Sequence, residues 1–138
     1  MSLDVQDRLR AQVSFDELRD LLHRVQYPEW LFWDRFDGMV EARDQGLLVG
    51  AFTYRCHQGT LRLGKFAADG PTTRARYRVA RALMAYVDGA ARARRLRVRA
   101  SIDTRTRLYP IVVKLLRRHG LTETTPERAD HTAWIRET

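Results

Sequence analysis

Cysteine, lysine and long apolar runs are what this sequence has least of. Cys56 is the only cysteine among 138 residues, which excludes an intramolecular disulfide and a thiolate-rich zinc site. The four histidines are scattered, with no pair at ligand spacing, so we predict no metal site. No apolar run approaches the roughly 18 residues of a membrane span. The N-terminal residues are polar rather than signal-like, so we expect a cytoplasmic protein with no membrane partner.

Lysine is nearly absent, whereas arginine is abundant: the chain has two lysines, 23 arginines and a net charge of +8. Residues 1–70 hold nine basic and eleven acidic side chains, whereas residues 71–138 hold sixteen and six. The second half, at +10, would suit the phosphates of a nucleic acid or an acidic protein surface. The sequence contains no recognisable nucleic-acid motif. The charge alone does not distinguish a nucleic acid from an acidic protein as the partner.

A length of 138 residues with 44% hydrophobic content is typical of one globular domain. We predict a single domain over residues 1–138. Periodicity and turn residues divide it into short elements. Strands are predicted at residues 8–13, 39–43, 47–56, 60–68, 95–102, 121–125 and 131–136, and helices at 14–25, 28–36, 74–93 and 110–120. The predicted order is β-α-α-β-β-β-α-β-α-β-β, which is an α/β (α+β) fold with a mixed sheet of about seven strands and four helices.

Two predicted elements carry arginines on one face. On the helix at residues 74–93, arginines lie opposite an apolar stripe, so that side of the helix is expected to be solvated. In the strand at residues 95–102, Arg95, Arg97 and Arg99 alternate with apolar residues and therefore share a face. A dry row of arginines would be costly. We therefore predict that this face is wet or contacts an anionic partner.

The stretch YPEWLFWDRF, residues 27–36, concentrates aromatic side chains in a short predicted helix. The candidates for one exposed face of this segment are Tyr27, Trp30, Trp33 and Phe36. Trp, Tyr and Phe are enriched at protein interfaces, but aromatic residues also fill cores. The two interpretations are an interface with a protein partner or a second copy, and a set of core residues.

The order of elements resembles the GNAT fold, that of the Gcn5-related N-acetyltransferases, over essentially the whole chain. The best match covers residues 74–121, through ARYRVARALM, LRVRASI and LLRRHGL. The stretch EARDQGLLVGAFTYR also looks like the hairpin that precedes the cofactor-binding strand of that family. A narrower resemblance, in RYRVARALMAYVD and KLLRRHGL, is to short GNAT-like proteins encoded among virion genes of short-tailed phages.

The resemblance implies a site for acetyl-CoA at the start of the third helix, where backbone N–H groups hold the pyrophosphate. Glycine is needed there because the backbone must approach the phosphates closely. Laid on this chain, the family's key glycine falls on Arg78 and its last small residue on Ala80, so only Ala80 fits. The conditional cofactor-binding residues are Arg74, Arg76, Tyr77, Arg78, Val79 and Ala80.

The catalytic positions that the resemblance implies also differ from the family's pattern. The general-acid tyrosine falls on Leu116, and Tyr109, seven residues earlier, is the substitute candidate on the same helix. The strand that supplies a glutamate base in many members offers Lys65 and a terminal Asp69 instead. None of the family's usual catalytic residues stands at its expected position.

We therefore predict a degenerate, non-catalytic GNAT-fold protein that acts through its surfaces, as a phage virion, assembly or protein-interaction component. No cofactor is then expected, and the partner is a protein or a second copy of the chain. The alternative is a divergent N-acetyltransferase that uses acetyl-CoA, and the third hypothesis is a basic protein that associates with nucleic acid. Fold alone does not decide among these functions.

Overall fold

The computed structural model describes residues 2–27 and 35–138, and its strands and helices follow the predicted order. The strands are β1 (Leu3–Leu9), β2 (Gly38–Asp44), β3 (Leu47–His57), β4 (Thr60–Ala68), β5 (Arg97–Asp103), β6 (Thr122–Thr124) and β7 (His131–Arg136). The helices are η1 (Arg10–Gln12, a 3-10 turn), α1 (Phe15–Arg24), α3 (Thr73–Ala93) and α4 (Tyr109–Arg118). Three α-helices are therefore described rather than four, and residues 28–34 of the predicted second helix lie outside the described part.

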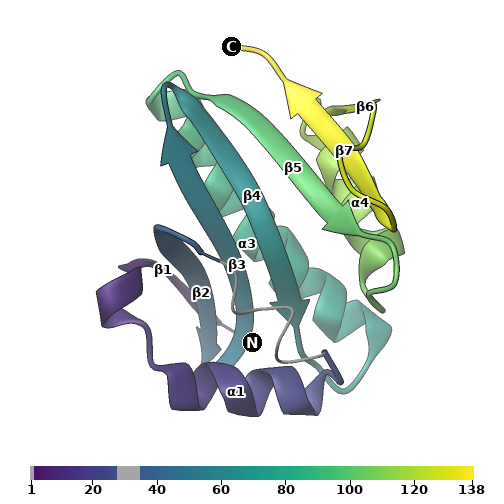
Figure 1. Cartoon of the computed structure of the whole chain (residues 1–138). Helices are drawn as coiled ribbons and strands as arrows, with labels where there is room; N and C mark the ends of the chain where they lie inside the picture. Colours follow the sequence, from purple (N-terminus) through teal and green to yellow (C-terminus); the bar gives the residue numbers. More distant parts are fainter. Residues whose placement is uncertain (1, 28–34) are drawn as a thin grey trace.

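All seven strands form one twisted sheet in the order β1-β2-β3-β4-β5-β7-β6 (Figure 1). Every neighbouring pair is antiparallel except β4 and β5, which run parallel because α3 connects them. The predicted single α/β domain with a mixed seven-stranded sheet is thereby confirmed. None of the helices in the described residues is long and apolar enough to span a membrane.

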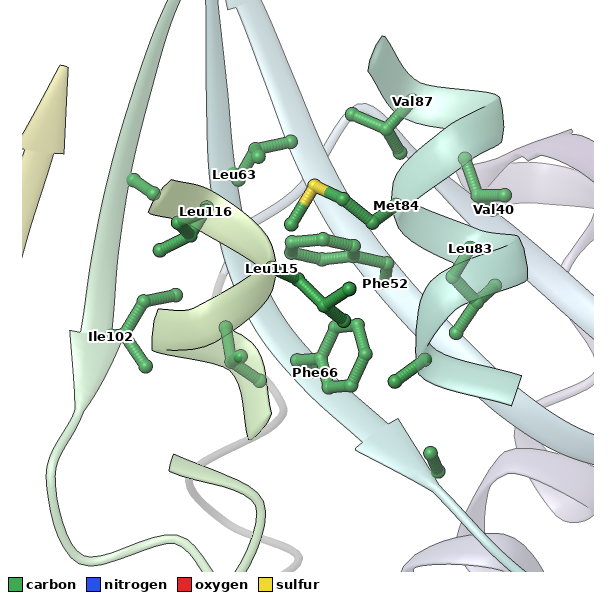
Figure 2. Close-up of a cluster of buried hydrophobic side chains, with 14 of the residues drawn as sticks. Val40, Phe52, Leu63, Phe66, Leu83, Met84, Val87, Ile102, Leu115 and Leu116 are labelled. Carbon is green, nitrogen blue, oxygen red and sulfur yellow. The ribbon is translucent and has the colours of Figure 1, made fainter. Parts of the chain in front are cut away.

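The two faces of the sheet bury separate hydrophobic clusters. Under α3 and α4, Phe52 and Phe66 meet edge to face with ring centroids 4.7 Å apart, and side chains from both helices close over them (Figure 2). On the opposite face, α1 buries Leu18, Leu21 and Leu22 against the sheet. These leucines recur at helical spacing, and Ser14 caps the helix by accepting a hydrogen bond from the Glu17 N–H.

The two hairpins joining β2 to β3 and β3 to β4 have the turns that the sequence predicts. Gln45 and Gly46 have φ values of 50° and 85°, and Gln58 and Gly59 have 49° and 75°. Two consecutive residues at positive φ are characteristic of the two-residue turns that match the twist of antiparallel strands. Glycine at the second position relieves the strain that a β-carbon would introduce.

Replacing Gly46 by alanine is expected to destabilise the fold by about 1 kcal/mol, because the backbone at φ 85° penalises a β-carbon. Apart from Gly46 itself and its two neighbours in the chain, no described residue has an atom within 4 Å of that β-carbon, so the loss would report backbone strain alone. The matched control is Gly89→Ala, an exposed position four residues before the end of α3, where space is equally open. It should stabilise by about 0.5–1 kcal/mol. Urea denaturation measures both, and equal effects would contradict the argument.

Two predicted strand boundaries are wrong. The first strand was expected at residues 8–13, but β1 ends at Leu9, because its partner β2 begins at Gly38 and offers no further ladder. The chain then turns through η1, which starts with a hydrogen bond from the Arg10 N–H to the Asp37 carbonyl. Arg95 was placed on the strand face, yet it lies at φ 53° in the turn before β5.

Candidate functional site

The sheet opens between β4 and β5. Their parallel pairing runs from Thr60 with Arg97 to Leu63 with Ala100 and then ends. Beyond this point β4 continues to Ala68 and β5 continues to Asp103, and the two strands diverge (Figure 1). Side chains do not fill the resulting gap, and a cleft of about 760 Å³ remains between the strand ends.

Three parts of the fold supply the walls of this β4–β5 cleft. They are the C-terminal ends of β4 and β5, the first turns of α3 and α4, and the segment that follows α1. Its described lining residues are Arg24, Val25, Gln26, Tyr27, Phe66, Ala67, Ala68, Asp69, Gly70, Thr73, Arg76, Asp103, Arg105, Thr106, Arg107, Leu108, Pro110 and Ile111. A volume of this size is within the usual range for small-molecule and cofactor sites.

The loop between β4 and α3 brings a helix N-terminus to the cleft. Thr72 is the N-cap of α3, and its hydroxyl accepts a hydrogen bond from the Ala75 N–H at 3.1 Å. At Gly70, a β-carbon would lie 2.8 Å from the Ala75 β-carbon, so glycine permits the loop to pass this close to the helix. The N–H groups of the first turn and the helix dipole favour an anion at this end of the cleft.

Arg76 is held at the same corner of the cleft. Its guanidinium donates hydrogen bonds to the Gly70 carbonyl at 3.0 Å and to the Thr73 hydroxyl at 3.1 Å. Both acceptors are uncharged, so the full positive charge of Arg76 stays available to a ligand. A guanidinium fixed beside a helix N-terminus is a suitable receptor for phosphate oxygens.

The described lining of the cleft contains four arginines and two aspartates, so it carries a net positive charge. Two of the four arginines have carboxylate partners. Arg24 donates to the Asp69 carboxylate at 2.9 Å. Arg105 donates to both carboxylate oxygens of Asp103, at 3.0 and 2.8 Å, and lowers the Asp103 pKa to about 2. Neither Arg76 nor Arg107 is paired with a carboxylate in the described part of the chain.

Among the six residues predicted to bind a cofactor, Arg76 is the one that lines the cleft. Arg74 and Arg78 are exposed on α3. The Tyr77 hydroxyl accepts a hydrogen bond from Arg118, and Val79 and Ala80 are buried in the core beneath the helix. Because α3 begins at Thr73, Arg78 lies in its second turn rather than at its start. The lining residues Gly70 and Thr73 were missed, although the Thr-Thr pair is an N-cap signal.

The catalytic candidates lie at different places. Leu116 is fully buried, as its apolar side chain requires. The Tyr109 hydroxyl donates to Thr132 on β7 at 3.2 Å, and Tyr109 is not among the described lining residues of the cleft. Asp69 lines the cleft and is paired with Arg24, and Lys65 is buried. A catalytic role for Tyr109 stays a prediction.

The predicted contact residues are divided between the core and the surface. Tyr27 and Phe36 are buried, at 8% and 5% exposure, as the core interpretation expects, whereas Trp30 and Trp33 lie outside the described residues. Arg97, exposed on β5, is bound to Glu137 at 2.6 Å. Arg99 lies 4.0 Å from Glu127 and shares the face of Arg97. Binding of a protein partner at this face stays a prediction.

Solved structures of similar architecture include enzymes that transfer acyl groups. An acyl-CoA N-acyltransferase from Pseudomonas aeruginosa matches with a TM-score of 0.65 at 20% identity, over 98% of this chain and 99% of that chain. A probable acetyltransferase from Staphylococcus epidermidis gives 0.72 at 10% identity, over 99% of both. The PaiA N-acetyltransferase from Thermoplasma acidophilum, solved in complex with coenzyme A, gives 0.68 at 8% identity over 100% of both.

No protein-family model and no curated protein sequence matches this chain. The evidence of relationship is therefore structural. A putative acetyltransferase of the GNAT family is also among the structures that match over nearly the whole length, with a TM-score of 0.72 at 16% identity. The chain has a GNAT-like fold, as the sequence resemblance implied.

Proposed function

We propose that the chain is a GNAT-fold N-acyltransferase that binds acyl-CoA in the β4–β5 cleft. The observation that carries the proposal is the open cleft of about 760 Å³, bordered by the first turn of α3 and by Arg76. Protein interiors are otherwise close-packed, and a fold kept only as a scaffold does not require a hollow between its central strands. The CoA complex of one structural neighbour adds support from analogy.

The residues of the cleft fit the chemistry of CoA. Its pyrophosphate would lie against the first turn of α3, where Thr73 N–H and the Arg76 guanidinium offer donors and positive charge. The unpaired charge of Arg107 suits another phosphate of the same molecule. Apolar wall residues such as Phe66 and Ile111 suit the uncharged pantetheine arm.

When bound, acetyl-CoA supplies a thioester: the acceptor nitrogen forms the new amide bond, the C–S bond breaks, and the proton lost by the amine balances the one gained by the thiolate. The protein's own part is to bind and orient the two molecules, which accounts for a large share of the rate of such transfers. Arg76 and the start of α3 hold the charged end in place.

Isothermal titration of the protein with CoA tests the proposal directly. We expect saturable binding of CoA and acetyl-CoA, and weaker binding of pantetheine, because pantetheine lacks the phosphates that contact α3 and Arg76. Acyl transfer is then followed by mass spectrometry of the acceptor, because the exposed thiol of Cys56 would react in a thiol-release assay. If none of the three compounds binds, the acyltransferase proposal fails.

The virion, assembly or interaction role without catalysis is the competing hypothesis. It is motivated by the arginine at position 78 and by the absence of the family's usual catalytic residues from the sequence. A failure of CoA to bind, together with co-purification of a large partner, would favour it. An open, positively charged cleft favours the acyltransferase.

A further inference from the structure

A second pocket, of about 340 Å³, lies on the α1 face of the sheet, where β3 and β4 meet β5 and β7. We call it the basic pocket. Its basic lining residues are Arg35, Arg55, Arg62, Lys65, Arg128 and His131. No carboxylate belongs to its described lining, so a cationic molecule would be repelled from it.

The register of the sheet places arginines of this face directly beside one another. Arg55 on β3 is the cross-strand partner of Arg62 on β4, and Arg62 is the partner of Arg99 on β5. Like charges opposite each other destabilise a sheet. Arg99 has Glu127 nearby, at 4.0 Å, whereas Arg55 and Arg62 have no ion pair within the described ranges. An anion bound between them would remove this repulsion.

Comparison with the neighbouring strand shows that the chain does pair its arginines elsewhere on the same face. On β2, Glu41 accepts from Arg8 at 3.1 Å and from Arg43 at 3.0 Å. Arg43 also binds Glu17 of α1, and these partners raise its pKa. The arginines of β2 are therefore neutralised by carboxylates of the fold, whereas no carboxylate of residues 2–27 or 35–138 forms an ion pair with Arg55 or Arg62.

His131 provides an independent indication that this pocket holds a ligand. It is 8% exposed, and its Nδ1 lies 2.9 Å from the Ala129 carbonyl. A carbonyl only accepts, so Nδ1 carries the proton and Nε2 of the neutral ring is an acceptor. That Nε2 is buried and has no hydrogen-bond partner among the described residues. A buried acceptor without a donor is costly, and an N–H group of a ligand would satisfy it.

The linings of the basic pocket and of the β4–β5 cleft contain neighbouring residues of β4, next to a bulge. Thr53 faces two residues of β4, Gly64 and Lys65, because the register shifts there, and the Thr53 hydroxyl accepts from the Lys65 N–H at 2.8 Å. Lys65 lines the basic pocket, while Phe66, the next residue, lines the cleft. A ligand in each pocket would therefore lie on either side of the same short segment of β4.

We propose that the basic pocket binds the acceptor of the reaction and that this acceptor is a small amine bearing a carboxylate or phosphate group. The anionic group is held by the arginines, and the amine donates to His131 Nε2. The claim that the ligand is the acceptor of the reaction rests on the proposed acyltransferase function. The chemical class of the ligand is inferred from the charges and the histidine of the pocket itself. Aminoglycoside-like or polyamine acceptors, which are multiply cationic, are excluded by the same charges.

Binding is tested without CoA, by NMR chemical-shift titration of the full chain. The probes are O-phosphoethanolamine and glutamate, which are anionic amines, and ethanolamine and spermidine, which are cationic. We expect the anionic amines to bind and to shift the signals of His131 and Arg62, with the cationic amines causing no saturable shift. The affinities of O-phosphoethanolamine and glutamate are compared with each other. The tighter of the two shows whether the pocket prefers a phosphate or a carboxylate.

Arg62→Ala combined with Arg128→Ala should weaken binding of the preferred probe about tenfold or more, as expected for loss of charge-assisted hydrogen bonds. The matched control is Arg81→Ala, an exposed arginine of α3 away from the pocket, which should leave the affinity unchanged. With His131→Phe, O-phosphoethanolamine should lose its advantage over ethyl phosphate, which has no amine. Thermal melting verifies that each variant is folded.

The outcomes separate the two proposals. Tighter binding of cationic amines, an equal loss in Arg81→Ala, or preference for an oligonucleotide with steep salt dependence would overturn the anionic-acceptor proposal, whatever CoA does. Binding of anionic amines without binding of CoA would uphold the pocket and reject the acyltransferase. If both bind, acetylated O-phosphoethanolamine or N-acetylglutamate should appear once acetyl-CoA is added.

Discussion

Replacing Arg76 by glutamate is expected to weaken CoA binding about a hundredfold, which corresponds to about 2.7 kcal/mol. The arginine lies at the corner of the β4–β5 cleft formed by Gly70 and Thr73. The substitution removes a guanidinium that would bind phosphate oxygens and puts a carboxylate beside them, so attraction becomes repulsion. Isothermal titration with CoA measures the loss, and pantetheine, which has no phosphates, should be nearly unaffected.

Arg78→Glu is the matched control, because it makes the same charge change two residues further along α3. Arg78 is exposed and does not line the cleft, and its position in the second turn places its N–H within the helix ladder. We expect the affinity to fall less than about threefold, through long-range charge alone. An equal loss in both variants would show that only overall charge matters, and a loss confined to Arg78→Glu would restore the motif alignment.

The hairpins and the long helix could be predicted because their signals are local. Gly46 and Gly59 mark turns in which the second residue adopts positive φ, and no distant part of the chain changes that preference. The apolar stripe of α3 likewise depends on spacing within one segment and is buried as expected. Element type and order follow from such signals, which is why the fold resemblance was sound.

The position of the β4–β5 cleft was harder to predict, since the motif alignment directed attention to Arg78, where the family's key glycine falls. The helix begins where a side chain can cap it, and the Thr72 hydroxyl does so. The N-cap Thr72 lies six residues before Arg78, and Gly70, Thr73 and Arg76 are the residues of this region that border the cleft. The N-cap signal therefore marks the end of α3 that borders the cleft, and binding of an anion there stays a proposal.

Residues whose partners are distant in the sequence could not be assigned from sequence patterns. His131 lay in a predicted strand, but its burial, and the lack of a partner for its Nε2 among the residues that the structure describes, depend on neighbours brought there by the sheet. Asp88 is likewise the centre of an ion cluster whose partners are 31 and 48 residues away in the sequence.

Asp88 connects α3, the C-terminal end of α4 and β7 through hydrogen bonds and ion pairs. Its carboxylate accepts from Arg92 one turn further on α3 at 3.0 Å, from His119 after α4 at 2.8 Å, and from Arg136 on β7. Arg136 also donates to the His119 carbonyl at 2.7 Å, which closes the cluster at the C-terminal end of α4. The side chains of Asp88 and Arg136 are each 13% exposed, so solvent screens this pair weakly.

Protonation of Asp88 at low pH should break the ion pairs of this cluster. Burial raises the Asp88 pKa, but hydrogen bonds from His119, Arg136 and Arg92 outweigh it and leave the pKa below its ordinary value of 3.8. A depressed folded-state pKa stabilises the fold above the unfolded value, and the contribution is lost as the pH falls from there through the folded-state pKa. The wild-type protein should therefore lose part of its stability below about pH 4, and a variant without Asp88 should lose less over that interval.

Asp88→Ala is expected to destabilise the fold by about 3 kcal/mol, the largest stability change that we predict for one residue. The variant leaves the Arg136 guanidinium largely buried, with the His119 carbonyl as its remaining hydrogen-bond acceptor among the described residues, and an uncompensated buried charge is strongly unfavourable. Asp4→Ala, which removes an exposed carboxylate bonded to Gln6, should change the stability by less than about 0.5 kcal/mol.

A second variant distinguishes two possible causes of this instability. One is the unpaired buried charge of Arg136, and the other is the loss of the hydrogen bonds that connect α3, α4 and β7. If the stranded guanidinium causes the instability, Arg136→Met combined with Asp88→Leu should recover most of the 3 kcal/mol, because apolar side chains can replace a buried ion pair at little cost. If the double variant is as unstable as Asp88→Ala, the carboxylate is needed to hold α3, α4 and β7 together through directed hydrogen bonds. Urea denaturation at pH 7 distinguishes the two, with the slope of the unfolding free energy against urea concentration verifying a common unfolded state.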